Sequence, residues 1–456
     1  MIKLKASETL NKVKINSNTY YIYDSLFGNL TRVNSDIIKL ISYINAKDYI
    51  AQNEKLNKRI KETINFLKSN NFLVPNNFNP RELLITRFKD YIKEAKSGKF
   101  ITNLRLNITD SCNCTCRYCY VHTIKGKKSQ SISENTAKQA ITKFIYMAKK
   151  NNLKHLTIRF FGGEPLLYPE LIKNLMLYSN NLSKKYHIRV HYIINTNGTI
   201  MSKEIAGTFS RFKVGVIVSL DGMGLENDRN RVFANGKGTF EIINKTLDLL
   251  LKYNNKVIIS TVINPGSSYR KLKQFIDYLR NKGIKFVGIN PLQKYDKKYY
   301  RYRGFRKVAK MLIAIKKYGL RKGIFVNGSW EMLFLKLTHP SFSYCGGIGK
   351  ELSVNPNGDI YPCSALSTKW GNIKNLDKIP KTSKYISILN RSIPFLRGCI
   401  NCEIEAICSG GCAAESEFVF GDMNQPAPGC YFRRYLTKQM ILEDNPKLFT
   451  DRKLDI

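Results

Sequence analysis

The chain has 456 residues, 43% of them hydrophobic, and its 75 Lys and Arg outweigh its 34 Asp and Glu to give a formal net charge of +41. This length predicts more than one domain, and the hydrophobic fraction excludes a chain that is disordered throughout. No apolar run approaches the ~18 residues of a transmembrane helix, and the segment Met1–Lys5 lacks the apolar core of a secretory signal. We therefore expect a cytoplasmic protein with no membrane partner.

The positive charge has two interpretations. It can indicate an anionic partner, such as nucleic acid or an acidic peptide, or it can reflect solvated surfaces rich in Lys. The 11 cysteines fall in two blocks, four at 112–119 and seven at 345–430. In a reducing compartment cysteines are more often metal ligands than disulfides, so the two blocks predict two separate metal-binding regions.

Residues 1–78 are predicted to form a separate α+β domain. A turn is expected at Gly28–Asn29, between the last two of three short β-type stretches: 12–15, 19–24 and 30–33. Ser35 is expected to cap the first of three helices: 36–44, 49–56 and 59–69. An apolar strand follows at 72–74. This winged-helix order is typical of a DNA-binding module or of a peptide-recognition domain, and an inert cap is a third interpretation.

Residues 79–100 are predicted to be a linker helix that begins at Pro80. Residues 101–292 then alternate between strand and helix. The predicted strands are 104–108, 156–161, 188–194, 214–220, 257–263 and 286–289. The helices between them include 133–149, 170–182, 240–253 and 269–282. Repeated βα units predict a parallel sheet, whose chemistry lies on loops at the carboxyl ends of the strands.

The loop after the first of these strands carries Cys112-x3-Cys116-x2-Cys119. Three thiolates at this spacing can hold three corners of a cubane iron–sulfur cluster, which leaves one iron open to bind a substrate or cofactor. A zinc site with His122 as fourth ligand is the alternative. Cys114 is extra to the pattern and is interpreted as a bystander or an alternative ligand.

This loop, with Tyr118 before its last cysteine, resembles the signature of the radical S-adenosylmethionine (SAM) superfamily, whose fold is a partial (β/α)6 barrel. The resemblance implies a [4Fe–4S] cluster on Cys112, Cys116 and Cys119 that binds SAM through its open iron. It also implies a reductant such as flavodoxin or ferredoxin, and a 5′-deoxyadenosyl radical that abstracts hydrogen from an unactivated carbon.

The ends of the next three strands supply candidate SAM contacts. The second strand ends in Gly162-Gly163-Glu164-Pro165, which resembles the family segment that holds the SAM amino group, with glycines that admit a close ligand. By the same resemblance, Thr196 and Asn197 face the ribose, Ser219 and Arg231 face the carboxylate, and Asp221 lies beside them. Asn227 stands where family members often have His. Each of these polar residues has the alternative role of a loop cap or turn.

Residues 293–343 are predicted to form a basic bridging region. Its stretch 294–322 carries twelve Lys or Arg with interleaved Tyr and Phe, and one acid. Such a pattern can bind single-stranded nucleic acid or an acidic peptide, or it can be a solvated helix face.

Residues 344–440 contain the second cysteine block, and 441–456 form a tail. The seven-cysteine order resembles the SPASM domain of peptide-modifying radical SAM enzymes, with zinc as the alternative. The resemblance implies two auxiliary [4Fe–4S] clusters, so three in all. One is on Cys399, Cys402, Cys408 and Cys430, and the other has only three thiolates, from Cys345, Cys363 and Cys412. The fourth position of the second cluster is open or is closed by another residue.

These resemblances imply a maturase for a ribosomally made precursor peptide with a leader, which the domain 1–78 would recognise by β-augmentation. Our hypothesis is that an open auxiliary iron binds a substrate Cys thiol, so that a thioether cross-link forms. Other outcomes are a carbon–carbon link, epimerisation, decarboxylation or sulfatase-type maturation. A nucleic-acid-binding protein with structural clusters is the alternative of another class, although nucleic acid is the less expected partner.

Overall fold

A computed structural model describes residues 3–47, 57–119, 121, 129–292, 304–393 and 395–450. Its centre is a ten-stranded sheet in the order β12-β11-β10-β9-β8-β7-β6-β13-β14-β15. Among the described residues, no helix is both long and apolar enough to cross a membrane.

Parallel strands form the middle of this sheet, and each pairs with the next one along the chain. They are β6 (Asn103–Thr109), β7 (His155–Gly162), β8 (Arg189–Thr196), β9 (Gly215–Ser219), β10 (Lys256–Ile263) and β11 (Phe286–Pro291). All six predicted strands are confirmed, with small shifts at their ends. Their apolar residues are buried, for example Leu104, Ile158 and Val216, as expected for a parallel sheet that helices cover.

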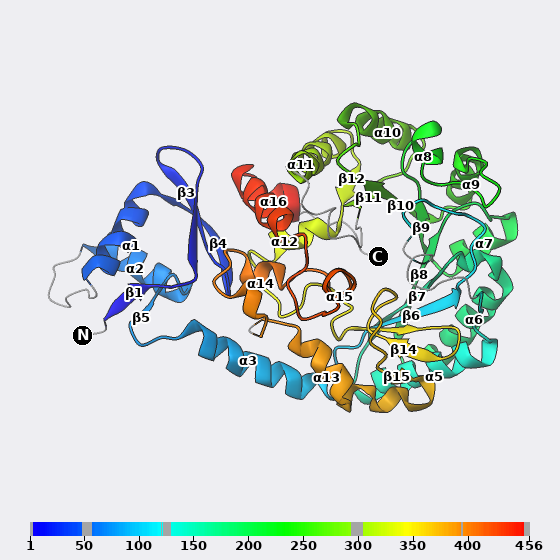
Figure 1. Ribbon diagram of the computed structural model, residues 1–456, viewed down its shortest axis with the longest axis horizontal. Coiled ribbons are helices and arrows are strands. Elements are labelled where there is room, and N and C mark those ends of the chain that lie inside the picture. Colours follow the sequence, from blue (N-terminus) through cyan, green and yellow to red (C-terminus); the bar gives the residue numbers. More distant parts are fainter. Residues whose placement is uncertain are drawn as a thin grey trace.

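The connecting helices lie on the outer side of the curved sheet, and the strands line its inner side (Figure 1). These helices are α5 (Glu134–Lys150), α6 (Pro169–Lys185), α7 (Lys203–Arg211), α8 (Leu225–Asp228), α9 (Phe240–Lys252), α10 (Tyr269–Asn281) and α11 (Phe305–Arg321). The curved arrangement confirms the predicted partial barrel, with its wide opening toward the C-terminal region.

The sheet continues past the barrel at both edges. β12 (Phe325–Asn327) pairs parallel to β11, and β13 (Glu351–Val354) pairs parallel to β6. β14 (Asp359–Tyr361) and β15 (Gly371–Asn372) then add antiparallel to β13. The second cysteine block is therefore joined directly to the strand that precedes the first one.

The N-terminal domain is built on a three-stranded antiparallel sheet of β2 (Leu10–Lys14), β3 (Thr19–Asp24) and β4 (Gly28–Asn34). One face of this sheet packs against α1 (Ser35–Lys47) and α2 (Lys58–Ser69), and β1 (Leu4–Ala6) pairs with β5 (Leu73–Pro75). The helix predicted over 49–56 lies outside the described residues. The winged-helix assignment stays a prediction.

Two local predictions in this domain are wrong. The hairpin turn is at residues 25–27 and not at Gly28–Asn29, because Asp24 Oδ1 accepts hydrogen bonds from the N–H groups of Leu26 and Phe27, at 2.8 and 3.0 Å. The cap of α1 is Asn34, whose Oδ1 accepts from Ile37 N at 3.1 Å, and not Ser35.

The other face of the N-terminal sheet packs against the C-terminal region. Tyr21 and Tyr23 are buried there, and β2 contacts α16 (Cys430–Leu442). The backbone of Ala406 donates to Ser25 O at 2.9 Å, and that of Leu30 donates to Leu337 O at 3.1 Å. The N-terminal sheet is thereby fixed to the cysteine-rich region.

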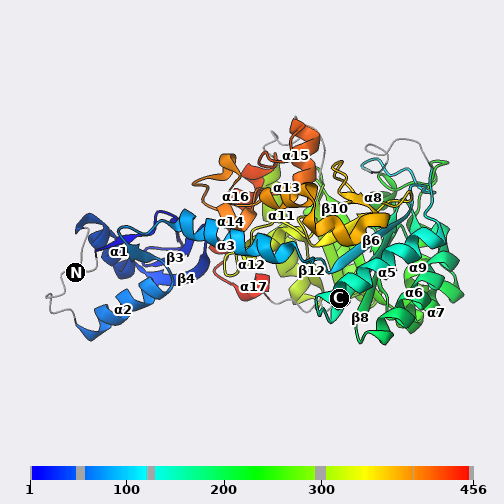
Figure 2. The same cartoon turned by 90° about the horizontal axis from the view of Figure 1, so that it is seen from below.

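The predicted linker helix is confirmed as α3 (Pro80–Ala95), which runs from the N-terminal domain to the barrel (Figures 1 and 2). Arg81 near its start forms an ion pair at 2.8 Å with Glu405, whose side chain is only 1% exposed. The helix is therefore anchored to the C-terminal region as well.

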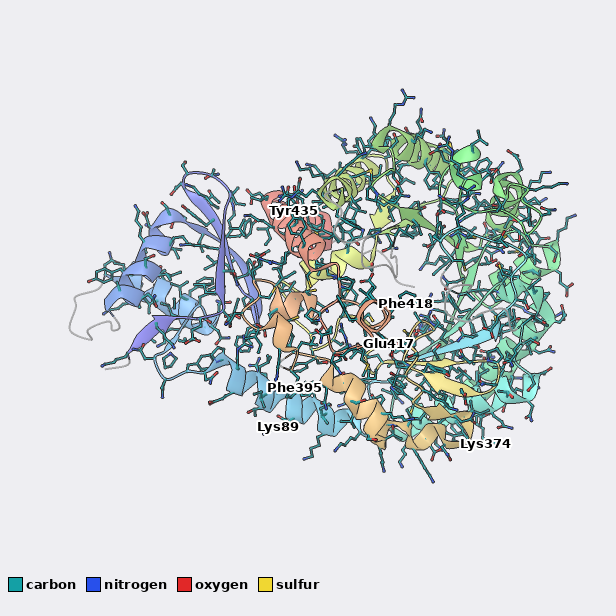
Figure 3. All side chains as sticks on the ribbon, viewed as in Figure 1. Lys89, Lys374, Phe395, Glu417, Phe418 and Tyr435 are labelled. Atoms are coloured by element: carbon teal, nitrogen blue, oxygen red, sulfur yellow. The ribbon has the colours of Figure 1, made fainter. Side chains whose placement is uncertain are left out.

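The C-terminal region is built from short helices. They are η3 (Ser329–Glu331), α12 (Met332–Leu335), η4 (Ile373–Lys381), α13 (Ser383–Asn390), η5 (Arg397–Cys399), α14 (Glu405–Cys408), α15 (Ala413–Phe420), α16 and α17 (Lys447–Thr450). α15, which carries Glu417 and Phe418, lies in the opening of the curved sheet (Figure 3).

The basic bridging region lies partly outside the described residues, which begin again at 304. Within it Lys316 is not at the surface: it is buried, pairs with Glu331 and donates to Val326 O at 2.9 Å. Lys307, Lys310 and Lys317 of α11 are exposed. The interpretation of this stretch as a solvated helix face is therefore wrong at Lys316, which is buried.

Candidate functional site

The cysteine loop lies at the carboxyl end of β6, where residues 230–234 hold it in place. The N–H groups of Thr115 and Arg117 donate to Val232 O and Asn230 O, at 2.8 and 3.0 Å. A bridge between Cys114 and Phe233 extends this contact. The loop is thereby fixed by backbone bonds that depend on no metal.

The thiols of Cys112 and Cys119, two of the predicted ligands, lie near enough to that of Cys116, the third, to affect its pKa. Burial, together with the neighbouring Cys119 and Cys112 thiolates, raises the pKa of Cys116 to about 11, although the Arg231 guanidinium opposes the rise. Within the described ranges, no three His, Cys, Asp or Glu side chains are close enough to hold a single metal ion. His122, the fourth ligand of the zinc alternative, lies outside those ranges.

Cys114 is the buried member of this loop, with 2% of its surface exposed. Its hydrogen bond to Cys112 and its burial raise its pKa well above the usual value. The pKa of Cys116, a predicted ligand, is raised as well, so the interpretation of Cys114 as a bystander stays a prediction.

Gly162 and Gly163 let the end of β7 pack onto the backbone that leads into the cysteine loop. A Cβ on Gly162 would lie 2.3 Å from Thr109 O, and one on Gly163 would lie 2.1 Å from Ser111 O. The amides of Gly163 and Glu164 donate to these two carbonyls, at 2.7 and 2.8 Å. The two glycines therefore allow the backbone after β7 to pack closely on the backbone of residues 109–111, and this contact is within the chain and not to a ligand.

Glu164 is completely buried between the ends of β7 and β8. Its Oε1 accepts from Leu166 N at 3.0 Å and from Thr196 Oγ1 at 2.8 Å, and its Oε2 accepts from Asn197 N at 2.6 Å. Burial raises the pKa of Glu164 to about 7, against the lowering effect of these donors. Pro165, also buried, begins the short helix η1 (Pro165–Leu167) that follows.

Asn197 connects the third strand to the cysteine loop. Its Nδ2 donates to Asn113 Oδ1 at 2.8 Å and lies 3.7 Å from Cys112 Sγ, and its Oδ1 accepts from Thr199 N at 2.9 Å. Asn113 is a member of this network that sequence reasoning missed, because nothing in the loop pattern marks it.

Asp221, Arg231 and Tyr118 form one buried group after β9. Arg231 Nε donates to Asp221 Oδ2 at 3.1 Å, and the Tyr118 hydroxyl donates to the same oxygen. The Arg231 guanidinium lies 5.5 Å from the Tyr118 ring centroid, and its Nη1 lies 3.8 Å from Cys116 Sγ. Ser219, at the end of β9, is half-buried. The structure thus joins Arg231 and Asp221 to the cysteine loop through Tyr118.

Asn227 and Asp228 are structural residues of this loop. Asn227 is completely buried, accepts from Asp221 N at 3.2 Å and donates to Thr239 Oγ1 at 2.9 Å. Asp228 Oδ1 accepts from Thr239 N and Phe240 N, at 2.8 and 2.9 Å, at the start of α9. No local pattern in the sequence indicates these bonds, since the partners are 6 to 12 residues apart along the chain.

The second cysteine block is divided into two groups in space. Cys399, Cys402, Cys408 and Cys430 line one cavity of about 360 Å³. Cys345, Cys363 and Cys412 form the other group: a Cβ on Gly347 would lie 3.6 Å from Cys345 Sγ and 3.3 Å from Cys363 Cβ. Burial, the Glu415 carboxylate and the Cys345 and Cys363 thiolates raise the pKa of Cys412. The structure thus brings together the members of each set that the resemblance implies, and their role as cluster ligands stays a prediction.

Two buried arginines, Arg391 and Arg433, lie near these thiols. Arg391 is completely buried, and its guanidinium donates to the carbonyls of Gly410 and Gly411, at 3.1 and 3.0 Å. Arg433 is 5% exposed, and its Nη1 has no hydrogen-bond partner within the described residues. A buried guanidinium near the thiols, with one nitrogen paired to Glu415 and the other without a partner, suits a site that takes up an anionic cluster.

Comparison with known families identifies two parts of the chain. Residues 106–279 match the radical SAM superfamily model, and residues 345–403 match the SPASM model, an iron-sulfur cluster-binding domain. Together the matches contain the first cysteine block and four cysteines of the second.

Two curated relatives span much of the chain. The radical SAM cyclopropyl synthase TigE of Paramaledivibacter caminithermalis is 26% identical over 460 residues, which cover 96% of each chain. An uncharacterized protein of Methanocaldococcus jannaschii is 31% identical over 286 residues, which cover 61% of this chain and 92% of that one.

Solved structures share the fold. The structure of anSMEcpe with bound AdoMet and Kp18Cys peptide has a TM-score of 0.64 at 21% identity and covers 76% of this chain and 99% of that one. The structure of Streptococcus suis SuiB bound to precursor peptide SuiA has a TM-score of 0.55 at 16% identity and covers 93% of this chain and 98% of that one.

Proposed function

This chain belongs to the radical SAM superfamily and carries a SPASM domain, and from that premise we propose that it modifies a ribosomally made precursor peptide. The superfamily uses an iron–sulfur cluster and SAM, which together supply a carbon-centred radical able to remove hydrogen from an unactivated carbon. The residues of this chain would position the two reactants.

We assign Cys112, Cys116 and Cys119 to the cluster that binds SAM. The fixed loop supports this assignment, because backbone bonds to residues 230–234 place the thiols before any metal arrives. Glu164 would accept the SAM ammonium group, since a buried carboxylate favours a cationic partner. Thr196 and Asn197 orient Glu164 and would lie beside the ribose. Arg231 would attract the SAM carboxylate, and Asp221 holds the Arg231 side chain in place.

We assign the second cysteine block to two further [4Fe–4S] clusters. Cys399, Cys402, Cys408 and Cys430 would hold one of them, and their shared cavity supports this set. Cys345, Cys363 and Cys412 would hold the other with three thiolates. Cys345 is exposed, so its cluster would be accessible from solvent.

The main support for a peptide substrate is the position of the N-terminal sheet, which is docked onto the C-terminal region through the backbones of Ser25 and Leu30. β2 and β4 are its two edge strands, and an edge strand can pair with an extended peptide. SuiB, whose fold spans 93% of this chain, has been solved with a precursor peptide bound. The leader would therefore bind beside the region in which the reaction takes place.

For the bond formed, we propose a thioether between a substrate Cys and a carbon of the same peptide. An auxiliary site with only three thiolates supports this, because it leaves room for a substrate thiolate. Carbon–carbon ring closure is the second candidate, since the relative that covers 96% of this chain is named a cyclopropyl synthase. Both products lose two hydrogens.

The experiment is anaerobic co-expression with short peptides encoded beside the gene, followed by intact-mass measurement and alkylation of free thiols. A loss of two hydrogens with a Cys no longer alkylated is expected. The same loss with every Cys still alkylated would replace the thioether by a carbon–carbon link. Cys412→Ala should abolish a thioether product, and a thioether formed by that variant would contradict the role of the three-thiolate site.

A further inference from the structure

Arg433 is the buried cation that connects the two cysteine groups of the SPASM domain. It lies on α16 one turn after Cys430, and Figure 3 marks that helix by Tyr435. Its Nη2 donates to Glu415 Oε2 at 2.9 Å, and the side chains of Arg433 and Glu415 are 7% and 2% exposed. Its Nη1 makes no hydrogen bond within the described residues. One edge of the guanidinium is thus paired, and the other is available.

Two glycines make room for this guanidinium, and each precedes a cysteine of a different group. A Cβ on Gly411, before Cys412, would lie 2.7 Å from Arg433 Cζ and 2.9 Å from its Nη1. A Cβ on Gly429, before Cys430, would lie 3.0 Å from Arg433 Nη1. The charge is therefore wedged between a turn of the three-thiol group and a turn of the four-thiol group.

A third neighbour completes the arrangement. The Arg433 guanidinium lies 5.5 Å from the ring centroid of Tyr344, which precedes Cys345. Arg433 thus contacts the backbone or side chain next to three proposed ligands, two of them in the three-thiol group and one in the four-thiol group. Among the described side chains, Arg391 has a different role, since its guanidinium donates to the carbonyls of Gly410, Gly411 and Gln425.

We propose that Arg433 is a positioning residue that sets the reduction potentials of both auxiliary clusters through one shared charge. The inference rests on the cluster assignment of the proposed function. A cluster gains negative charge when it is reduced, and a nearby cation in a medium of low dielectric constant stabilises the reduced form. Glu415 partly neutralises that cation, so Arg433 and Glu415 act on the potentials in opposite directions.

The test uses the full chain with Cys112, Cys116 and Cys119 all changed to Ala, so that only auxiliary clusters contribute. Iron analysis and EPR-monitored redox titration then give the occupancy and potential of each. We expect Arg433→Gln to lower both potentials by about 59 mV or more, which is a tenfold fall in the ratio of reduced to oxidised cluster at fixed potential. Glu415→Gln should raise both potentials.

Arg434→Gln is the matched control. Arg434 is the next residue, is exposed, pairs with Glu403 at 2.9 Å and lines the four-thiol cavity. Its loss should shift the four-thiol cluster alone. Unchanged potentials in Arg433→Gln, a shift of one cluster only, or shifts of the same sign in Arg433→Gln and Glu415→Gln would each overturn the proposal.

Iron content separates a failure of this inference from a failure of the proposed function. The parent protein should hold about eight irons, from two four-iron clusters. A clearly lower value would count against the cluster assignment itself. If Arg433→Gln loses iron, the Glu415→Gln variant distinguishes the two roles. Full iron content and raised potentials in Glu415→Gln would support the shared charge. Loss of iron from both variants would assign Arg433 and Glu415 a purely structural role and overturn the proposal.

Discussion

Glu164 accepts a hydrogen bond at 2.8 Å from Thr196 Oγ1, so the ends of the second and third barrel strands share one buried carboxylate. Asn197, the next residue, donates its backbone N–H to the same carboxylate and its side-chain amide to Asn113 of the cysteine loop. Three segments that are distant in sequence are thereby held in one arrangement at the proposed SAM site.

SAM affinity should depend on pH through Glu164. Because burial raises the pKa of Glu164 to about 7, its carboxyl is mostly neutral at pH 6 and mostly ionised at pH 8. The SAM ammonium favours the ionised form, so the dissociation constant should fall about fivefold from pH 6 to pH 7, below the pH of about 7.7–8.0 at which an α-amino group loses its own proton. Calorimetry on the anaerobic, cluster-loaded enzyme measures it. Glu164→Gln should bind weakly with no such trend, and an equal pH trend in that variant would contradict the role of Glu164.

Gly163→Ala should prevent the cysteine loop from forming. The new Cβ would lie 2.1 Å from Ser111 O, and neither backbone can move without breaking the bonds between them. We expect a loss of more than about 2 kcal/mol in the free energy of unfolding, measured by urea titration. Gly207→Ala is the control. Gly207 lies within α7, and a Cβ there would meet the Tyr253 side chain at 3.5 Å, an ordinary contact distance. This change should be neutral or stabilising by up to about 1 kcal/mol. Equal stability of the two variants would contradict the packing described.

Asp221→Asn should destabilise the loop after β9. The Asp221 and Arg231 side chains are 1% and 11% exposed, and removal of one member of a buried pair costs about 3–5 kcal/mol. The exposed pair of Glu226 with Lys271 provides the comparison, because Glu226→Gln should cost less than about 1 kcal/mol. Urea unfolding of both variants gives the two values. A cost for Asp221→Asn as small as that for Glu226→Gln would show that this group does not hold the loop.

The edge of the N-terminal sheet that binds the leader can be identified with proline. Leu30 N–H points outward from β4 to Leu337 O, so Arg32 N–H, two residues on, faces the same edge. Arg32→Pro removes that donor, and we expect at least tenfold weaker binding of the leader peptide in calorimetry.

Two variants control for other effects. Arg32→Ala keeps the backbone donor but loses the ion pair with Asp444, so it should bind the leader nearly normally. Lys12→Pro tests the opposite edge, on β2, beside a cavity of about 190 Å³ that β2 and α1 line. Weak binding in Lys12→Pro with normal binding in Arg32→Pro would assign the leader to β2 instead.

The barrel was predictable from sequence because its signals are local. Each of its strands is an apolar run such as Val257–Ile263, and each is followed by a helix of regular period, so the order of elements fixes a parallel sheet. The attachment of β13 to β6 was not predictable. Glu351–Val354 is a short stretch whose partner, Asn103–Thr109, lies far away in the sequence, and no pattern in either segment names the other.

In the candidate site, the cysteines were predictable from the sequence and the residues around them were not. Cysteine spacing indicated the thiol groups, because metal ligands leave a pattern in the chain. The hydrogen-bonded residues around them, such as Asn113, Asn227 and Arg433, leave none, since an Asn or Arg in a loop is usually solvated. The buried position of Lys316 was missed for the same reason: eleven other basic residues surround it in the stretch 294–322.

The central claim, that this enzyme removes hydrogen from a peptide, is tested most directly with a deuterated substrate. The reconstituted enzyme is incubated anaerobically with SAM, a reductant and a fully deuterated precursor peptide encoded beside the gene, and the 5′-deoxyadenosine formed is weighed. We predict that it carries one deuterium taken from the peptide. Deuterium-free 5′-deoxyadenosine, formed at the same rate with and without the peptide, would contradict the claim.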